Sequence, residues 1–261
     1  MKLYDWFTGA DGKRFSRQKN LRKLLNLSYT NWTNRTYAVG EMDLPEIICP
    51  TEVCPDYPAL YSRLKEYRQT SRTAICFYQY DNGFNGYEGL FAAIYYDRKD
   101  LLENFKKRFQ DAHFFIMPDD SVGGNIHRIE NEYRLFRSRV VALWLIHECN
   151  AVVVPNISFP TERSFSFALN GLERCSVVAF STKGHITKQK ERDYLKRSVK
   201  YAVDHLPLLQ RIIVYDVCRD NHHVDELFQY ASEHGIEIVV PDNCLKCRNR
   251  TRYEERHHER E

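Results

Sequence analysis

The chain has 261 residues, of which 43% are hydrophobic, so it can bury a sizeable core as one domain or as two unequal ones. Its 38 lysines and arginines stand against 35 aspartates and glutamates, and the formal net charge of +3 excludes a uniformly basic body. The longest apolar runs are too short to span a membrane, and the start MKLYDWFTG lacks the apolar stretch of a signal peptide. These features predict a soluble cytoplasmic protein with no membrane partner.

Residues 1–70 form a basic and irregular N-terminal segment. Between residues 13 and 40 there are seven basic side chains and no acidic one. They are Lys13, Arg14, Arg17, Lys19, Arg22, Lys23 and Arg35. Aromatic residues lie between them, and cations interleaved with aromatics are what contact with a nucleic-acid backbone requires. A short helix with a solvated basic face explains the pattern equally well. Four prolines between residues 41 and 60 predict extended, irregular chain there.

Residues 71–243 alternate between β-rich runs and helical patterns. The predicted strands lie within residues 73–80, 113–118, 151–155, 176–180, 211–216 and 236–242. The predicted helices include 98–109, 127–149, a brief piece near 162–169, and two later segments around Val199 and Leu227. In the helix over 127–149 the predicted buried stripe is Ile129, Tyr133, Phe136, Val140, Leu143 and Trp144.

Continuous Val/Ile runs joined by helices indicate parallel strands that are covered on both faces. The predicted fold class is α/β, with a mostly parallel sheet of about six to eight strands and helices between them. Its form is either barrel-like, as a complete or incomplete TIM-type barrel, or doubly wound. The predicted domain is 71–243, and 244–261 is a charged C-terminal tail, either a solvated helix or disordered.

A polar side chain follows each of the six predicted strands. These strand-end residues are Asp81, Asp119 with Asp120, Asn156, Ser181 with Thr182, Asp216, and Asp242. Because the carboxyl ends of parallel strands meet at one rim, we expect a binding or catalytic site there. The alternative is that Asp, Asn and Ser are ordinary residues at loop starts and helix N-termini.

The residue types at this rim indicate phosphate chemistry. The predicted catalytic residues are Asp81, Asp119, Asn156 and Arg163, and the predicted substrate-binding residues are Ser181, Thr182, Lys183 and Asp216. Several carboxylates on one rim repel one another unless a cation such as Mg²⁺, shared with the substrate's phosphates, offsets them. Arg163 would clamp a phosphate or neutralise a carboxylate. His185 is a candidate acid or base, against the alternative of a loop histidine without a role.

Two close cysteine pairs raise the question of zinc. Cys49 and Cys54 form one pair, and Cys244 and Cys247 form the other. Four thiolates would make a structural Zn²⁺ site. The pairs lie far apart in the sequence, and the alternative is that all of the cysteines are reduced and scattered.

Several segments together resemble an uncharacterised domain family that is common in bacterial phages, plasmids and integrative elements. The matching stretches are MDLPEI, FIMPDDS, YRLFRSRVVALWL, AVVVPNISFPTERSFSFALNGL, SVVAFSTKGHITKQKERDYL and RIIVYD. The likeness covers about residues 41–216. It implies a mobile-element context and the bacterial cytoplasm, and it names no reaction.

Two classes of function follow from the sequence. The first is an enzyme that processes a nucleotide or nucleic acid at the rim of the sheet. The second is a non-enzymatic protein that binds nucleic acid or a host partner through the basic residues 13–37, or that sequesters a nucleotide. Fold class alone does not decide between them.

Overall fold

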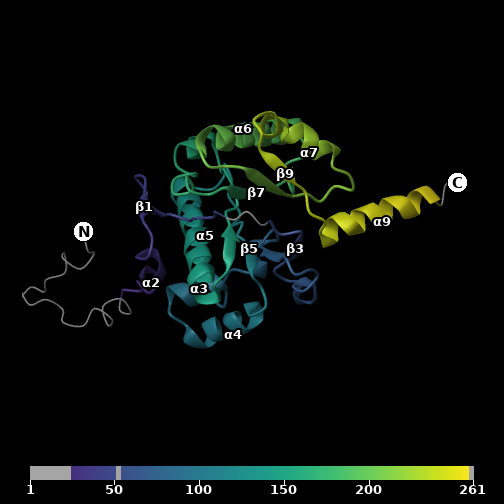
Figure 1. Cartoon of the computed structure of the whole chain (residues 1–261). Coiled ribbons are helices and arrows are strands. Elements are labelled where there is room, and N and C mark those ends of the chain that lie inside the picture. The colour runs from purple at the N-terminus through teal and green to yellow at the C-terminus, as the bar shows by residue number, and fades with distance from the viewer. Residues whose placement is uncertain (1–24, 51–53, 259–261) are drawn as a thin grey trace, which may run out of the picture.

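The computed structural model describes residues 25–50 and 54–258, and Figure 1 shows the whole chain. The strands are β1 (Ala38–Val39), β2 (Leu44–Pro45), β3 (Tyr57–Leu60), β4 (Thr73–Cys76), β5 (Phe114–Ile116), β6 (Val152–Val154), β7 (Val177–Ser181), β8 (Arg211–Tyr215) and β9 (Glu237–Val239). The α-helices are α2 (Thr30–Thr33), α3 (Leu90–Tyr95), α4 (Lys99–Phe109), α5 (Arg128–Cys149), α6 (Gln189–His205), α7 (His222–Leu227), α8 (Gln229–Glu233) and α9 (Cys244–His258). Short 3-10 helices are η2 (Leu64–Glu66), η3 (Asp81–Gly83) and η4 (Glu162–Ser166).

The described strands form two parallel sheets and one small antiparallel pair. A four-stranded sheet has the order β3-β4-β5-β6, a three-stranded sheet has the order β7-β8-β9, and β1 pairs with β2. The α/β class and the parallel pairing are therefore confirmed. The predicted single sheet of six to eight strands is wrong, because the strands divide into sheets of four and three. The barrel-like form stays a prediction.

One isolated parallel bridge, Asn156–Ala179, connects the end of β6 to β7. Pro155, next to this bridge, has no N–H to donate to a neighbouring strand. Its carbonyl accepts a hydrogen bond from the Ala179 N–H at 2.7 Å. The Ile157 N–H in turn donates to the Ala179 carbonyl at 2.8 Å. The bridge places the end of β6 directly beside β7, so residues from both sheets meet there.

Each of the six predicted strand segments contains a strand, and β3 is the strand that the prolines concealed. It lies at one edge of the four-stranded sheet, where Pro58 pairs in register with Ala74 of β4. An edge strand tolerates proline because the missing N–H is not needed by a second neighbour. Residues 57–60 thus belong to the sheet instead of to an irregular segment.

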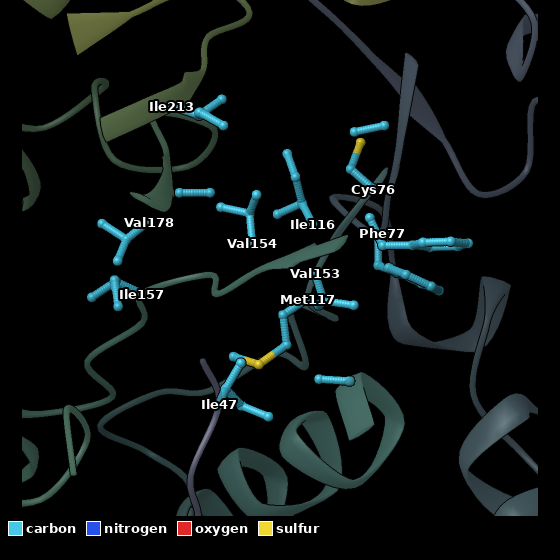
Figure 2. Packing of buried hydrophobic residues seen from close by; sticks show 14 of the residues in the cluster. Ile47, Cys76, Phe77, Ile116, Met117, Val153, Val154, Ile157, Val178 and Ile213 are labelled. Atoms are coloured by element: carbon cyan, nitrogen blue, oxygen red, sulfur yellow. The ribbon is translucent and has the colours of Figure 1, made fainter. Parts of the chain in front are cut away.

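Both faces of the four-stranded sheet are buried. Figure 2 shows Ile116 and Val154 on one side of the sheet, pointing toward Ile213 of β8, while Met117 points the opposite way, toward Ile47 and a helix. All five side chains are at most 3% exposed. Figure 1 shows α5 beside β5, with α3 and α4 near the lower end of α5, and it shows α6 and α7 beside β7 and β9. Burial on two faces explains why the strands read as continuous apolar runs.

Helix α5 differs from its predicted stripe. Ile129 and Tyr133, in its first turns, are 74% and 39% exposed. Every residue from Ser138 to Leu145 is buried, so the second half of the helix is enclosed on all sides. The period of the apolar residues does not reveal where a helix leaves the core, because that depends on the neighbouring elements.

Among the helices in residues 25–50 and 54–258, none combines the length and the hydrophobicity that a membrane span requires.

A buried arginine on α5 fixes two connecting segments to this helix. Arg139 is 2% exposed, and its guanidinium donates to the carbonyls of Pro45 at 3.3 Å, Ala168 at 3.2 Å and Asn170 at 3.3 Å. Loss of solvation lowers the pKa of Arg139 to about 10. Carbonyl oxygens satisfy this cation in place of a carboxylate, and they tie β2 and the turn after η4 to α5.

Candidate functional site

A cavity of about 200 Å³ opens where the carboxyl ends of β5, β6 and β7 meet. Its polar walls come from the residues that follow these strands and from one face of α6. They include Asp119, Asp120, Ser121, Asn156, Ser158, Ser181, Lys183, His185, Tyr194 and Ser198. The bridge between β6 and β7 brings strand ends from both sheets to this one place.

A chain of hydrogen bonds leads from the interior to the carboxyl group of Asp119. The Tyr78 hydroxyl donates to Asn156 Oδ1 at 2.8 Å, and Asn156 Nδ2 donates to Asp119 Oδ1 at 2.8 Å. Tyr78 is 2% exposed, and its ring stacks on Tyr215 of β8 with ring centroids 4.6 Å apart. The buried tyrosine fixes which way the amide points, and the amide in turn fixes the carboxyl group.

The environment of Asp119 makes its proton harder to remove. Burial raises the pKa of Asp119 to about 6, and the nearby carboxyl groups of Asp120 and Asp81 contribute in the same direction. The hydrogen bond from Asn156 and the charge of Lys183 oppose this rise and are outweighed. A carboxyl group of this kind exchanges its proton close to neutral pH, as a general acid or base must.

Lys183 and His185 place nitrogen atoms at the same cavity. The Lys183 ammonium donates to the Tyr78 carbonyl at 2.8 Å, and the Lys183 N–H donates to Ser181 Oγ at 3.1 Å. Desolvation lowers the pKa of His185, which lines the cavity although the residue as a whole is exposed. Gly184, between them, has φ +86°, a backbone conformation that side chains with a Cβ rarely adopt. The loop after β7 thus presents one cation and one neutral imidazole.

Asp81 and Asp120 support the loop that carries Asp119. Asp81 accepts hydrogen bonds from the Ser121 N–H at 3.0 Å and the Ser121 hydroxyl at 2.7 Å, and it pairs with Arg134 at 3.0 Å. Asp120 is 7% exposed, accepts a hydrogen bond from Asn85 and pairs with Arg137 at 3.4 Å. Burial raises the pKa of Asp120, and Arg137 opposes this. Asp81 therefore lies one contact away from the cavity and not on its wall.

Thr182 and Asp216 lie outside the cavity, in a buried cluster. Both are fully buried, and the Thr182 hydroxyl donates to Asp216 Oδ1 at 2.6 Å. Lys246 of α9, 2% exposed, pairs with Asp216 Oδ2 at 3.4 Å and also donates to Asn221. Neither residue lines the cavity, so the prediction that Thr182 and Asp216 contact substrate there is corrected. One oxygen of Asp216 accepts the hydrogen bond from Thr182 after β7, and the other pairs with Lys246 and attaches α9 to the end of β8. Asp242, the remaining strand-end aspartate, pairs with Arg250 at 3.0 Å.

The structure separates Arg163 from Asp119. Arg163 is exposed on η4 and lines a different cavity, with Arg128 and Thr161 among its neighbours there. It does not belong to the walls around Asp119, so the predicted clamp at that carboxyl group is corrected. The prediction relied on the closeness of Arg163 to β6 in the sequence. The chain continues over residues 157–161 beyond the first cavity, and Arg163 lies at the second one.

The predicted nucleic-acid arm falls mostly outside the described residues. Lys13, Arg14, Arg17, Lys19, Arg22 and Lys23 lie within residues 1–24, which the structure does not describe. Arg35 is described and exposed, in the turn after α2. Near it, Trp32 donates to Glu148 of α5 at 3.2 Å.

The four cysteines of the predicted zinc site do not form a metal-binding group. Cys49 is buried, and it forms an isolated bridge with Cys175 just before β7. The Cys54 sulfur accepts a hydrogen bond from Arg211 at 3.7 Å, whereas Cys244 and Cys247 begin α9. Across residues 25–50 and 54–258 no cluster of three or more His, Cys, Asp or Glu side chains has the arrangement of a metal site. The sequence paired these cysteines by spacing alone, and the fold directs them to different neighbours.

Sequence reasoning missed several residues that line or support the cavity. Tyr78, which supports it through Asn156, lies beyond the end of β4, and nothing in TAICFYQY distinguishes its hydroxyl from that of Tyr80. Tyr194 and Ser198 occupy one face of α6 beside Leu195, and the Tyr194 hydroxyl donates to the Phe159 carbonyl at 3.0 Å. Their four-residue spacing within a predicted helix was the available signal, since it places both on one face.

The fold and the cavity together define a parallel α/β protein with an ionisable carboxyl group at the strand ends. Residues 37–231 match the family described as a domain of unknown function (DUF4417), and the chain belongs to this family. The match covers most of the chain and contains every residue that lines the cavity around Asp119, and it ends before β9 and α9. The comparison with curated proteins finds no match. Membership of an uncharacterised family is thus confirmed, and the association with phages and plasmids stays a prediction.

Proposed function

We propose that this protein is an enzyme that acts on a phosphate-bearing substrate, a nucleotide or nucleic acid, with Asp119 as its general acid or base. The observation that carries the proposal is the pKa of about 6 at Asp119, in a cavity that also contains Lys183 and His185. Strongly shifted carboxyl groups in a cavity at the ends of parallel strands are typical of catalytic sites.

Each polar group then has a role that its contacts support. Asn156, held by Tyr78, orients the carboxyl group of Asp119. Lys183 supplies the positive charge for the phosphate, and Ser181 with Ser158 supplies hydroxyl groups along the wall. Asp81 positions the loop through Ser121 and makes no contact with substrate. The alternative role for Asp119 is that its ionised carboxylate holds a divalent cation such as Mg²⁺, with the substrate's phosphates as the other ligands; in that case it is not the acid or base.

The test is turnover of a panel of nucleoside triphosphates and of bis-(4-nitrophenyl) phosphate by Asp119→Asn. We expect at least a hundredfold loss of turnover, because an amide cannot exchange the proton and the remaining contacts stay in place. The matched control is Asp100→Asn, at an exposed position in the first turn of α4, and we expect this variant to keep full turnover. Turnover within a factor of two of wild type in Asp119→Asn contradicts the assignment, and omission of Mg²⁺ tests the cation separately.

A second candidate function is nucleic-acid binding without chemistry, and the basic segment 13–35 favours it. Its test replaces Lys13, Arg14, Arg17, Lys19, Arg22 and Lys23 by Gln in the full chain. If this segment holds the backbone, affinity for a single-stranded oligonucleotide should depend less steeply on salt in the variant, by about 0.7 in log–log slope per lost phosphate contact. An unchanged slope removes this candidate.

We also propose that the protein works in the bacterial cytoplasm as part of a mobile element. The resemblance in FIMPDDS and in the segment from β6 through η4 supports this context. Fractionation of cells that carry the gene at its native position tests the location. Recovery of the protein with the cell envelope contradicts it.

A further inference from the structure

A second cavity lies beside the first and has a different character. Its volume is about 380 Å³, and its basic side chains are His127, Arg128 and Arg163. The remaining walls are Gly124, Ile126, Asn131, Pro160, Thr161 and Phe167. No carboxylate is among its lining residues in the described part of the chain.

The positive charge of this cavity is only partly neutralised. Arg128 pairs with Glu132 one turn along α5, and its guanidinium carbon lies 5.7 Å from the centre of the Phe167 ring. The Arg163 guanidinium has no hydrogen bond or ion pair with any described residue, although Glu162 beside it pairs with Arg197 at 2.5 Å. A cation that stands free at a cavity wall is available to an anionic ligand.

The walls of this cavity are fixed before any ligand arrives. Asn131, 3% exposed, accepts a hydrogen bond from the Gly123 N–H at 3.1 Å and donates to the carbonyls of Gly123 at 3.0 Å and Ile126 at 3.2 Å. On the opposite wall, the Thr161 and Ser164 side chains form a capping box at the start of η4. Both loops therefore hold their shape through internal hydrogen bonds.

The two cavities share the same two loops. Residues 119–122 and 156–159 line the Asp119 cavity. Further along the same loops, the basic cavity is lined by Gly124, Ile126, His127 and Arg128 and by Pro160, Thr161 and Arg163. At the junction the loops lie close together, since a methyl group added at Gly124 would come within 3.9 Å of Thr161 Cγ2. The Asp119 cavity and the basic cavity are therefore neighbours along both loops.

We propose that the basic cavity holds a phosphate of the neighbouring nucleotide, so that the substrate is a single-stranded nucleic acid and not a mononucleotide. This inference rests on the proposed function and specifies its substrate class. A second phosphate is the group that a free guanidinium binds in bidentate fashion. A mononucleotide would occupy the first cavity and leave Arg163 without a partner.

The experiment compares binding of 5′-phosphorylated dithymidine (pTpT) and thymidine 5′-monophosphate by calorimetry. It uses the Asp119→Asn chain, in which turnover is blocked, with and without Arg163→Ala. We expect Arg163→Ala to weaken pTpT binding about tenfold and to change monophosphate binding less than twofold, because only pTpT reaches the basic cavity. The matched control is Arg68→Ala, an exposed arginine in the segment that precedes β4, at the opposite edge of the sheet, and it leaves both affinities unchanged.

Four outcomes overturn the inference: equal losses for both ligands, no loss for either, no measurable binding of pTpT, or competition by tetraglutamate as strong as that by pTpT. The last outcome would identify an acidic peptide as the ligand. The proposed function fails on a different result, undiminished turnover by Asp119→Asn. Binding of pTpT through Arg163 together with full turnover in Asp119→Asn would leave the strand-binding cavity in place and remove the role of Asp119.

Discussion

Two aspartates follow parallel strands in this protein, and the fold uses them in opposite ways. Asp119, after β5, faces a cavity, and its one described hydrogen-bond partner is the Asn156 amide. Asp216, directly after β8, is fully buried, and its two oxygens contact Thr182 and Lys246. The Asp119 carboxyl group has a raised pKa and keeps space beside it, whereas Asp216 is completely enclosed. The difference between them lies in the partners that surround each strand end.

Helix α9 decides the role of Asp216 at the end of β8. Asn243 Oδ1 accepts the N–H groups of Leu245 and Lys246 at 3.1 Å each, which fixes the start of the helix. Lys246 in this first turn then reaches Asp216, and Figure 1 shows the rest of α9 extending away from the body. A carboxylate that this helix covers is a structural anchor.

The largest expected effect comes from Lys246→Met, which leaves Asp216 buried without its cation. Breaking a buried ion pair by removing one partner costs about 3–5 kcal/mol, because the remaining charge has no solvent. Urea denaturation should show this loss in the free energy of unfolding. The control is Lys188→Met, whose side chain is 77% exposed and pairs only with Glu191, and we expect a change of less than about 0.5 kcal/mol. Equal losses in the two variants would contradict the role of Lys246 and Asp216 as a buried structural pair.

Asp216→Asn should be the next most damaging change. The amide can still accept the hydrogen bond of Thr182, but Lys246 loses its counter-charge in a buried place. We expect a loss of about 2–3 kcal/mol in the free energy of unfolding, with turnover per folded molecule unchanged. A variant that is fully stable but inactive would return Asp216 to the catalytic site.

Asp119→Asn should act on stability in the opposite sense, and its effect depends on pH. The folded-state pKa of about 6 lies above the ordinary value of 3.8, so the folded protein holds this proton more tightly than the unfolded chain does. In the wild type this contribution is complete below about pH 4 and is lost as the pH rises to about 6. The variant has no carboxyl group to ionise at this position, so its free energy of unfolding does not fall in this way. Its stability relative to wild type should therefore rise by on the order of 2 kcal/mol from pH 4 to pH 7. Denaturation curves at both pH values measure it, and parallel pH profiles of the two proteins would contradict the raised pKa.

The smallest expected effect is that of Tyr78→Phe, which tests whether the Tyr78 hydroxyl holds Asn156 in position beside Asp119. The substitution removes the hydroxyl that donates to Asn156 and keeps the ring that stacks on Tyr215. We expect a loss of about 1 kcal/mol in the free energy of unfolding and a measurable fall in turnover, because the Asn156 amide is then free to rotate. Tyr230→Phe, at an exposed hydrogen bond to Asp204, is the control and should affect neither quantity.

Much of the fold was predictable because a strand that is buried on both faces appears in the sequence as a continuous apolar run. The runs FFI, VVV, VVAFS and RIIVY each became a parallel strand, since a strand that is covered on both faces is apolar at nearly every position. Strand β3 was not predictable, because Pro58 is acceptable only at a sheet edge and the edge is known only once the strand order is known. The first turns of α5 failed for a similar reason, since Ile129 is apolar but nothing packs over it.

The candidate site was predictable in outline and not in its partners. The rule that parallel strands end at one rim brought Asp119, Asn156, Ser181 and Lys183 together correctly around one cavity. The same rule included Asp216, because it contains no information on what covers each strand end. Tyr78 and Lys246 decide the chemistry of the two aspartates from 41 and 30 residues away in sequence, so local patterns could not assign them.

The sequence by itself determined the alternation of buried strands and helices, and it determined that most strands end in a polar side chain. These properties follow from local preferences, namely apolar residues for buried strands and Asp, Asn or Ser for the turns that leave them. The tertiary structure alone decided that β6 meets β7 at a single bridge, that Arg163 faces its own cavity, and that Lys246 covers Asp216. The reason is physical: the pKa and the role of a carboxyl group depend on the solvent and charges around it, and packing between distant segments sets both.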